Sequence, residues 1–270
     1  METANILVTV NKNYIPILNV MLSSLLTSNP NCFFNIYLLQ TNVTEHDIFA
    51  AQKIIMQQGK IFLIETNEKE LDNAPTTSRY PQEIYFRIFA AKYLPHDIDR
   101  ILYLDPDIIV NGKINELYNM EMGDNFFAAA SHIGGLLQKV NEFRLDAQRN
   151  SPYINSGVML MNLRELRIKQ NYDAVFEYIQ KHKKTLVLPD QDIISGLYGK
   201  KIISLNPYYY NMTERLYMTR LIGGEDITLD WIKKNSVIIH YCGRNKPWKT
   251  NYIGALKVFY DDAARQVNVE

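Results

Sequence analysis

The chain has 270 residues, of which 47% are hydrophobic, and its 29 basic side chains balance 29 acidic ones. This zero net charge argues against nucleic acid as the main partner, because proteins that bind nucleic acid present a strongly basic surface. The length fits one large α/β domain and is sufficient to bury a sizeable core.

The two cysteines indicate neither a metal site nor a disulfide framework. Cys32 and Cys242 stand far apart, and each lies in an apolar run, so both are predicted to be buried small hydrophobic side chains. The chain does not begin with a positively charged segment followed by an apolar one, so no signal peptide is predicted. No apolar run reaches the ~18 residues that a membrane-spanning helix needs. We therefore expect a cytoplasmic protein in a reducing compartment.

The N-terminal part of the chain alternates between strand and helix patterns. Buried strands are predicted at residues 5–10, 33–39, 60–65 and 100–104. Between them, helices are predicted from the helical spacing of apolar residues from Leu18 to Leu26, from the partial capping box at Thr44, and over residues 81–93. A polar loop, residues 11–14, follows the first strand. This order predicts an α/β fold in three layers, with a mostly parallel sheet flanked by helices.

The C-terminal part is less regular. Further strands are predicted at residues 126–130, 157–163 and 237–240. Further helices are predicted at residues 172–181, 190–198 (started by Pro189) and 252–264. Residues 132–149 contain Gly134-Gly135 and many polar side chains, so we expect a mobile excursion there. No repeat or linker interrupts the chain, which predicts a single domain over residues 1–250 and a C-terminal helical segment over 251–270.

Asp105-Pro106-Asp107 is the most informative motif, because it follows directly on the buried strand at 100–104. Ligands of open α/β sheets bind in the crevice at the carboxyl ends of the strands. Two carboxylates there suit Mg²⁺ or Mn²⁺ carrying a diphosphate, since hard cations prefer oxygen ligands, and Pro106 restricts the backbone between them. The alternative is an ordinary turn rich in Asp and Pro.

A second motif runs from His240 to Trp248. His240 follows a strand and is a candidate metal ligand through a neutral ring nitrogen. Gly243 permits close approach of the backbone to a phosphate, and Lys246 can place a positive charge on it. Taken singly, a structural histidine, a solvated lysine and a packed tryptophan are the alternatives.

Three further segments carry polar side chains near strand and helix ends. Asn155 precedes an apolar strand, Asp190 and Gln191 open a helix, and Arg87 lies within one. A turn residue, helix caps and a solvated arginine are the alternatives for these positions.

In their order and joint presence, these segments resemble glycosyltransferase family 8, the retaining enzymes of the GT-A fold that use UDP-sugars. The resemblance runs from Ile6 to Trp248. Its most specific pieces are Asp105-Pro106-Asp107, Tyr153-Ile154-Asn155-Ser156-Gly157, Pro189-Asp190-Gln191-Asp192, His240-Tyr241-Cys242-Gly243 and Lys246-Pro247-Trp248. It implies a Rossmann-like GT-A domain.

The resemblance also implies roles for individual residues. Asp105, Asp107 and His240 match the ligands of Mn²⁺ (or Mg²⁺), and Gln191 matches the group beneath the anomeric carbon, with Asp190 beside it. The positions that match residues binding the donor are Thr9, Asn11, Asn13, Tyr14, Arg87, Pro106, Asn155, Gly243 and Lys246. One departure is Asn11, where relatives often carry Asp, although an amide can still accept a hydrogen bond from uracil.

The implied activity is the transfer of galactose or glucose from a UDP-sugar, with retention, to a glycan, lipid-linked or protein-linked acceptor. Because Gln191 is a poor nucleophile, front-face attack by the acceptor is favoured over a covalent intermediate on Asp190. The alternatives are an inactive sugar-nucleotide binding protein on the same fold and an Asp-dependent phosphohydrolase. Acceptor loops are expected at 132–152 and 206–230, where aromatic residues either stack on sugars or pack: Tyr208, Tyr209, Tyr210, Tyr217 and Trp231.

The C-terminal segment suggests peripheral contact with the inner face of a membrane. It is basic and aromatic, and its relevant residues are Trp248, Lys249, Tyr252, Lys257, Phe259 and Tyr260. The alternative is a packed C-terminal helix with solvated lysines.

Overall fold

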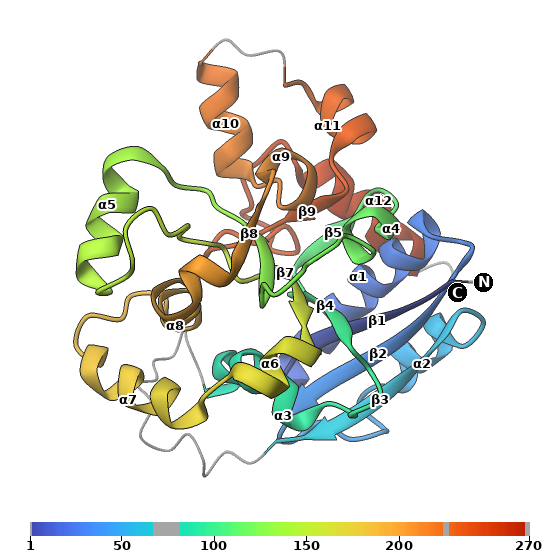
Figure 1. Cartoon of the computed structure of the whole chain (residues 1–270). Helices are drawn as coiled ribbons and strands as arrows, with labels where there is room; N and C mark the ends of the chain where they lie inside the picture. Colours follow the sequence, from blue (N-terminus) through green and yellow to red (C-terminus); the bar gives the residue numbers. More distant parts are fainter. Residues whose placement is uncertain (1, 67–81, 224–226, 268–270) are drawn as a thin grey trace.

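The computed structural model describes residues 2–66, 82–223 and 227–267. Within them, a seven-stranded sheet in the order β3-β2-β1-β4-β7-β6-β8 forms the centre of the molecule, with helices on both faces (Figure 1). Its strands are β1 (Glu2–Thr9), β2 (Cys32–Gln40), β3 (Gly59–Glu65), β4 (Arg100–Leu104), β6 (Phe127–Ala130), β7 (Val158–Asn162) and β8 (Ile202–Leu205). Only β7 runs antiparallel to its neighbours, β4 and β6, so the predicted α/β fold with a mostly parallel sheet is confirmed.

The side chains of β1 alternate between two cores. Ile6 and Val8 belong to the core on one face of the sheet, whereas Leu7 belongs to the core on the other. The first core is covered by α1 (Ile15–Ser28), α2 (Phe49–Ile55) and α4 (Asn115–Tyr118). The second is covered by η3 (Gln82–Phe89), α3 (Ala90–Tyr93), α6 (Leu163–Lys169), α7 (Tyr172–His182) and α8 (Pro189–Tyr198). The inner strands β4, β6 and β7 are buried along nearly their whole length, which explains why they appear in the sequence as apolar runs, whereas most residues of the edge strand β3 are half-buried or exposed.

A second, two-stranded sheet lies beyond the end of β4. Its strands, β5 (Ile108–Val110) and β9 (Ile238–His240), pair antiparallel and place Ile108 opposite His240. Around it lie α9 (Pro207–Tyr210), α10 (Glu214–Ile222), α11 (Leu229–Asn235) and α12 (Lys257–Val267). This small sheet brings together two segments that are far apart in the chain.

Several predicted elements differ from the observed ones. The helix predicted to begin at Thr44 begins at Phe49. Residues 45–48 form turns instead, and Thr44, just before them, donates hydrogen bonds from its N–H and its hydroxyl to the Asp47 carboxylate. The segment predicted as a helix over 81–93 is a 3-10 helix followed by a short α-helix, and Pro81 lies outside the described residues. Neither the short strands β5 and β8 nor the short helices α4, α9 and α11 were predicted.

The mobile excursion predicted at 132–149 is wrong in one respect. Residues Gly135–Arg144 form helix α5, and the glycine pair stands at its start rather than interrupting it. Gly135 has φ +57, a left-handed conformation that glycine adopts without strain. No residue of α5 is buried, so its apolar side chains give no core-facing stripe of the kind that sequence patterns detect.

The aromatic residues of the C-terminal segment pack within the protein. Phe259 is buried in a third core with Tyr241, and Trp248 contacts the rings of Tyr14 and Tyr260. The final helix begins at Lys257, later than predicted. This packing favours the alternative of a packed C-terminal helix over lipid contact. Among the described residues, no helix is both long and apolar enough to cross a membrane.

Candidate functional site

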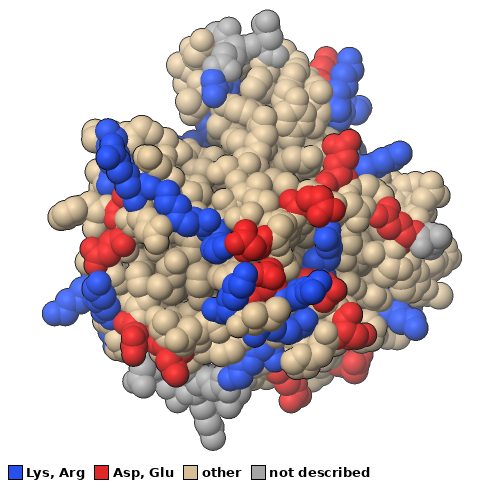
Figure 2. All heavy atoms as spheres, in the orientation of Figure 1, with Lys and Arg blue, Asp and Glu red and all other residues tan. Residues whose placement is uncertain are grey.

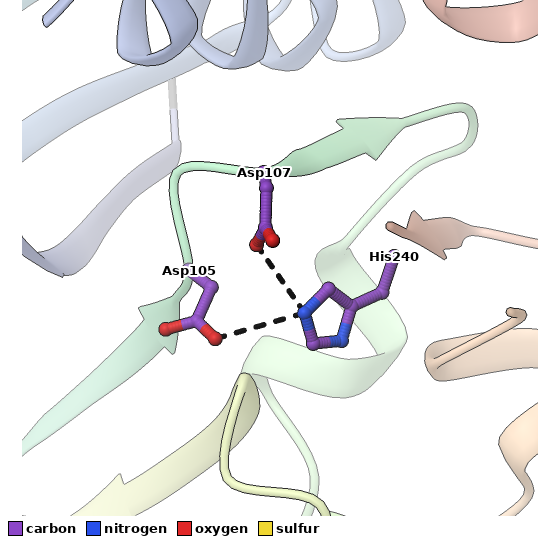
Figure 3. A group of neighbouring side chains, drawn as sticks. All are labelled: Asp105, Asp107 and His240. Atoms are coloured by element: carbon purple, nitrogen blue, oxygen red, sulfur yellow. Dashed lines mark ion pairs between the residues drawn. The ribbon is translucent and has the colours of Figure 1, made fainter. Parts of the chain in front are cut away.

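Three side chains from two sheets form a cluster with the donor atoms of a metal site. Asp105 follows β4, Asp107 precedes β5, and His240 ends β9. His240 Nε2 lies 3.3 Å from Asp107 Oδ1 and 3.6 Å from Asp105 Oδ2, as Figure 3 shows. One ligand atom from each residue lies within 4.8 Å of the others. The structure therefore brings these three sequence-predicted residues together.

Main-chain hydrogen bonds hold the turn that carries the carboxylates. The Asp105 N–H donates to the Gly157 carbonyl at 2.8 Å, and the Tyr241 N–H donates to the Asp107 carbonyl at 3.0 Å. Pro106 is buried between the two aspartates. The turn is thus fixed to β7 on one side and to β9 on the other, so the carboxylates are held in place independently of any ligand.

Lys246 lies inside the cluster rather than on the surface. It is only 9% exposed, its ammonium pairs with Asp107, and it also donates to the Tyr241 carbonyl at 2.9 Å. Burial raises the pKa of Asp107, but the neighbouring His240 and Lys246 outweigh it and hold the pKa below its ordinary value. Asp107 is therefore an ionised, buried carboxylate, as a metal ligand must be.

Gly157 leaves the space that the cluster occupies. A Cβ atom at this position would lie 2.2 Å from His240 Cε1 and 2.7 Å from Asp105 Oδ2. Two carboxylate oxygens and one imidazole nitrogen suit Mn²⁺ or Mg²⁺. The donor set and the cleared space both fit a divalent cation at this point.

Arg87 joins the carboxylates to the opening of α8. Its Nη1 lies 3.1 Å from Asp105 Oδ1 and 3.0 Å from Asp190 Oδ2, and its guanidinium stacks on the Tyr103 ring. Arg87 is buried, so the predicted alternative of a solvated arginine is wrong. Burial raises the pKa of Asp190, although Arg87 and a 2.6 Å hydrogen bond from Ser156 Oγ oppose this effect.

Asn155 and Gln191 form the part of the site beside Asp190. The Asn155 amide nitrogen donates to Gln191 Oε1 at 3.2 Å, and Asn155 Oδ1 accepts from the Gly157 N–H at 3.1 Å. Both side chains are half-buried, whereas Asp190 is buried. The structure therefore brings the predicted sugar-side residues together, next to the cluster of Asp105, Asp107 and His240.

The end of β1 and the loop after it hold four further predicted donor residues, Thr9, Asn11, Asn13 and Tyr14. Asn11 caps the short helix η1 (Lys12–Tyr14) by accepting from the Asn13 N–H at 3.1 Å. Thr9 is buried beside Arg87 and bonds the Tyr103 hydroxyl at 2.9 Å.

On the opposite loop, Gly243 is exposed and has φ +96, a left-handed conformation in which any side chain would be strained. Cys242 beside it is exposed as well, so the prediction of two buried cysteines holds only for Cys32.

Sequence reasoning missed three residues that organise the site. Asn211 is fully buried and contacts His240, Asn155 and His132. The sequence also predicts no role for Asp192, although it stands in the segment Pro189-Asp190-Gln191-Asp192. No periodicity or local motif marks Asn211 or His132, because their partners lie far away in the chain.

Asp192 anchors α5 to α8. It is fully buried, it binds Arg144 through two hydrogen bonds of 2.7 and 2.8 Å, and it accepts from the Tyr153 hydroxyl at 2.8 Å. The outer side of α5 is exposed, with Leu136 and Phe143 77% and 89% accessible. α5 is thus tied at one edge and open to solvent along the other.

The aromatic cluster predicted near the acceptor packs mostly on itself. Tyr217 is buried, Tyr209 packs on Trp231 at 5.8 Å between ring centroids, and Arg220 lies over the Tyr208 ring. On the face drawn in Figure 2, acidic and basic residues are interspersed without a large area of either sign.

Comparison with known proteins identifies relatives across nearly the whole chain. Residues 5–252 match the model of "Glycosyl transferase family 8". A lipopolysaccharide 1,2-glucosyltransferase of Escherichia coli is 28% identical over 261 residues, which cover 94% of this chain and 76% of that protein. A lipopolysaccharide 1,3-galactosyltransferase of Salmonella typhimurium is 25% identical, covering 90% and 72%. The galactosyltransferase LgtC, solved with donor and acceptor sugar analogues, shares the fold with a TM-score of 0.82 and 23% identity, covering 97% of this chain and 95% of LgtC.

Proposed function

This chain belongs to glycosyl transferase family 8, and we propose that it transfers a hexose, galactose or glucose, from a UDP-sugar to a glycan, lipid-linked or protein-linked acceptor with retention of the α configuration. One observation carries the proposal: the cluster of Asp105, Asp107 and His240 is joined through Arg87 to Asp190, beside Gln191. A diphosphate site and a sugar site are thereby held at a fixed separation. Family membership argues against the phosphohydrolase alternative, and so does the position of Asp105 after β4, the fourth strand of the chain, rather than after the first.

The proposed donor is supported by the charge of the site. A divalent cation held by Asp105, Asp107 and His240 would supply Lewis-acid stabilisation of the leaving diphosphate. Lys246 adds a second positive charge on the same side, and Gly243 leaves the backbone there open to a phosphate. The turn after β1, with Asn11, Asn13 and Tyr14, is proposed to hold the uridine.

The sugar-side residues orient the donor. We assign Asp190 and Asn155 to hydroxyl groups of the hexose, because both present polar atoms next to Gln191. Gln191 lacks a charge and is a poor nucleophile. Asp190 pairs with Arg87 and accepts a hydrogen bond from Ser156, and both contacts make its carboxylate a poorer nucleophile.

The reaction that fits these residues is front-face substitution. The bond from C1 to the diphosphate oxygen breaks while the acceptor oxygen bonds to C1 on the same face, and the acceptor's proton passes to the departing phosphate oxygen. UDP and an α-linked glycoside are the products. The acceptor is proposed to enter past α5 and α9–α11, the helical side of the site (Figure 1). The names of the relatives support a glycan on a lipid as one class of acceptor.

A donor screen tests the proposal. The melting temperature should rise with UDP-glucose or UDP-galactose in the presence of Mn²⁺ and not in EDTA, because a ligand that binds only the folded state stabilises it. GDP-mannose serves as the matched control. Turnover to UDP, with product stereochemistry from the anomeric proton by NMR, then tests transfer. Stabilisation without turnover in the presence of glycan acceptors would favour the inactive binding protein, and a β-linked product would overturn the front-face mechanism.

A further inference from the structure

Asn211 connects the metal-binding side of the site with its sugar side. Its side chain is completely buried, with Oδ1 3.0 Å from His240 Nδ1 and Nδ2 3.0 Å from Asn155 Oδ1. Asn155 in turn donates to Gln191 Oε1. His240, Asn211, Asn155 and Gln191 therefore form one continuous chain of hydrogen bonds.

The direction of this chain is set by a main-chain donor. The Gly157 N–H can only donate, so the Asn155 atom that faces it at 3.1 Å must be the oxygen. That oxygen also faces Asn211, so Asn211 must present its NH₂ group there and its oxygen to His240. An amide oxygen cannot donate, and His240 must therefore carry a proton on Nδ1.

The consequence for His240 is chemical. With the proton on Nδ1, a neutral imidazole has its lone pair on Nε2, and Nε2 is the atom that faces Asp105 and Asp107. Metal-bound histidines are generally oriented by a partner of this kind on the other ring nitrogen. Asn211 is this partner, because its Oδ1 lies within hydrogen-bonding distance of His240 Nδ1.

We propose that Asn211 is a positioning residue that fixes the tautomer and orientation of His240 for a divalent cation and, through Asn155, orients Gln191. Its place is fixed by the main chain, because the Met212 N–H donates to the Ile238 carbonyl and the His240 N–H donates to the Met212 carbonyl. His132 binds the Asn211 carbonyl at 2.8 Å and completes the attachment. The proposal rests on the metal-dependent function proposed above.

Two substitutions separate the two arms of Asn211. Asn211→Leu has a similar shape but lacks both hydrogen-bonding groups, and we expect its dissociation constant for Mn²⁺ to rise about 10–100-fold, the range typical of such supporting residues. Asn211→Asp keeps an acceptor for His240 but sets an oxygen against Asn155 Oδ1. We expect this variant to bind Mn²⁺ no more weakly than the unmodified protein while its kcat falls about tenfold, since Gln191 loses its support.

The control is Asn111→Ala. Asn111 donates to the Ser236 carbonyl at 2.7 Å, at the other end of the same β5–β9 pair. This variant should lose stability without a change in Mn²⁺ affinity. Circular dichroism and thermal unfolding establish that each variant is folded before its affinity is compared.

The tautomer is measured without metal. In the unmodified protein at a pH where the ring is neutral, ¹⁵N chemical shifts of His240 should show a protonated Nδ1, and Asn211→Leu should give a mixture of tautomers. A protonated Nε2 in the unmodified protein, or unchanged Mn²⁺ affinity in folded Asn211→Leu, would overturn the proposal. Failure of the unmodified protein to bind Mn²⁺ would instead contradict the proposed function, and the NMR result would still decide the tautomer.

Discussion

The two sides of the site are built in different ways. On the donor side, Asp105, Asp107 and His240 stand at strand ends, and Lys246 is buried on the loop after β9, where it pairs with Asp107. Close contacts of His240 Nε2 with both carboxylates complete this side. On the helical side, α5 has no buried residue and is attached through the pair of Arg144 with Asp192 and a hydrogen bond from Gln138 to the Ser151 carbonyl. The difference indicates that the donor side is preorganised, whereas the helical side depends on a few buried polar contacts.

Under the proposed function, this difference would separate chemistry from specificity. The proposed positions of the leaving diphosphate and the reacting carbon depend on the sheet, which cannot shift without disturbing the cores on both of its faces. Helices at the surface tolerate change more readily. We therefore expect substitutions on the donor side to affect the chemical step and substitutions on the outer side of α5 to affect the acceptor.

The largest effect is expected at the proposed metal ligands. Asp107→Ala or His240→Ala should reduce transfer by about 10³-fold or more, because several kcal/mol of charge stabilisation are lost and each ~1.4 kcal/mol is tenfold in rate. Steady-state UDP release with and without Mn²⁺ measures it. Asp124→Asn is the matched control, since Asp124 is exposed and pairs only with Lys201 among the described residues. Full activity of either ligand variant in metal-free buffer would refute the assignment.

A second prediction concerns the space beside the ligands. Gly157→Ala should weaken Mn²⁺ binding, because the added methyl group collides with His240 and Asp105. Transfer should fall by about 100-fold, because a small displacement of these side chains would misplace the reacting groups. Mn²⁺ titration by calorimetry measures the first effect. Gly134→Ala, which would meet no atom within 4 Å, should behave like the unmodified protein. Equal affinity in both variants would contradict the close packing of the cluster.

His132 lies just before α5, binds the Asn211 carbonyl and gives a pH test. Burial lowers its pKa from 6.5 to about 4, so the unfolded chain binds more protons than the folded one between these values. The contribution of His132 to the free energy of unfolding is fully present above pH 6.5 and decreases as the pH falls toward 4. Between about pH 7.5 and pH 5 it should contribute a loss of about 2 kcal/mol in the free energy of unfolding. Urea unfolding of the metal-free protein measures the loss, which should shrink in His132→Gln; an identical pH dependence in that variant would rule His132 out as the cause.

The smallest effect is expected on the outer side of α5. Because Leu136 and Phe143 are largely exposed, the double substitution Leu136→Ser/Phe143→Ser should change the free energy of unfolding by no more than about 0.5 kcal/mol. Transfer to a lipid-linked acceptor should fall a few-fold, while hydrolysis of the UDP-sugar stays unchanged. Ile168→Ser on α6, another exposed apolar residue, is the control. Loss of hydrolysis in the α5 variant alone would show that the two sides are not separable.

The same contrast explains what could be predicted from the sequence. The strands β1, β2, β3 and β4 contain apolar runs, so this part of the sheet could be predicted. Asp105 follows β4 and His240 ends β9, and no spacing in the sequence connects them, so their meeting could be expected only from the resemblance to the family. The direction of β7 could not, because an apolar run does not reveal whether it pairs parallel or antiparallel.

The long-range polar contacts could not be predicted from the sequence either. Asn211 contacts Asn155 from a position 56 residues away, and Arg144 contacts Asp192 from 48 residues away. Neither pair has a spacing that marks one face of a helix or strand. Helix α5 was not predicted for a related reason, because its apolar side chains face solvent instead of a core.

The pairing of β5 with β9 determines which side chain reaches the carboxylates. His240 stands opposite Ile108, and a slip of one residue would place Ile239 there and turn the imidazole to the other face of the small sheet. Pairing of such distant segments is slow, because the chain loses conformational entropy when the loop closes, before the contacts that compensate for this loss have formed. We therefore expect the cluster of Asp105, Asp107 and His240 to be among the last parts of the molecule to assemble during folding, and recovery of Mn²⁺ affinity after dilution from urea should lag behind recovery of the sheet's circular dichroism.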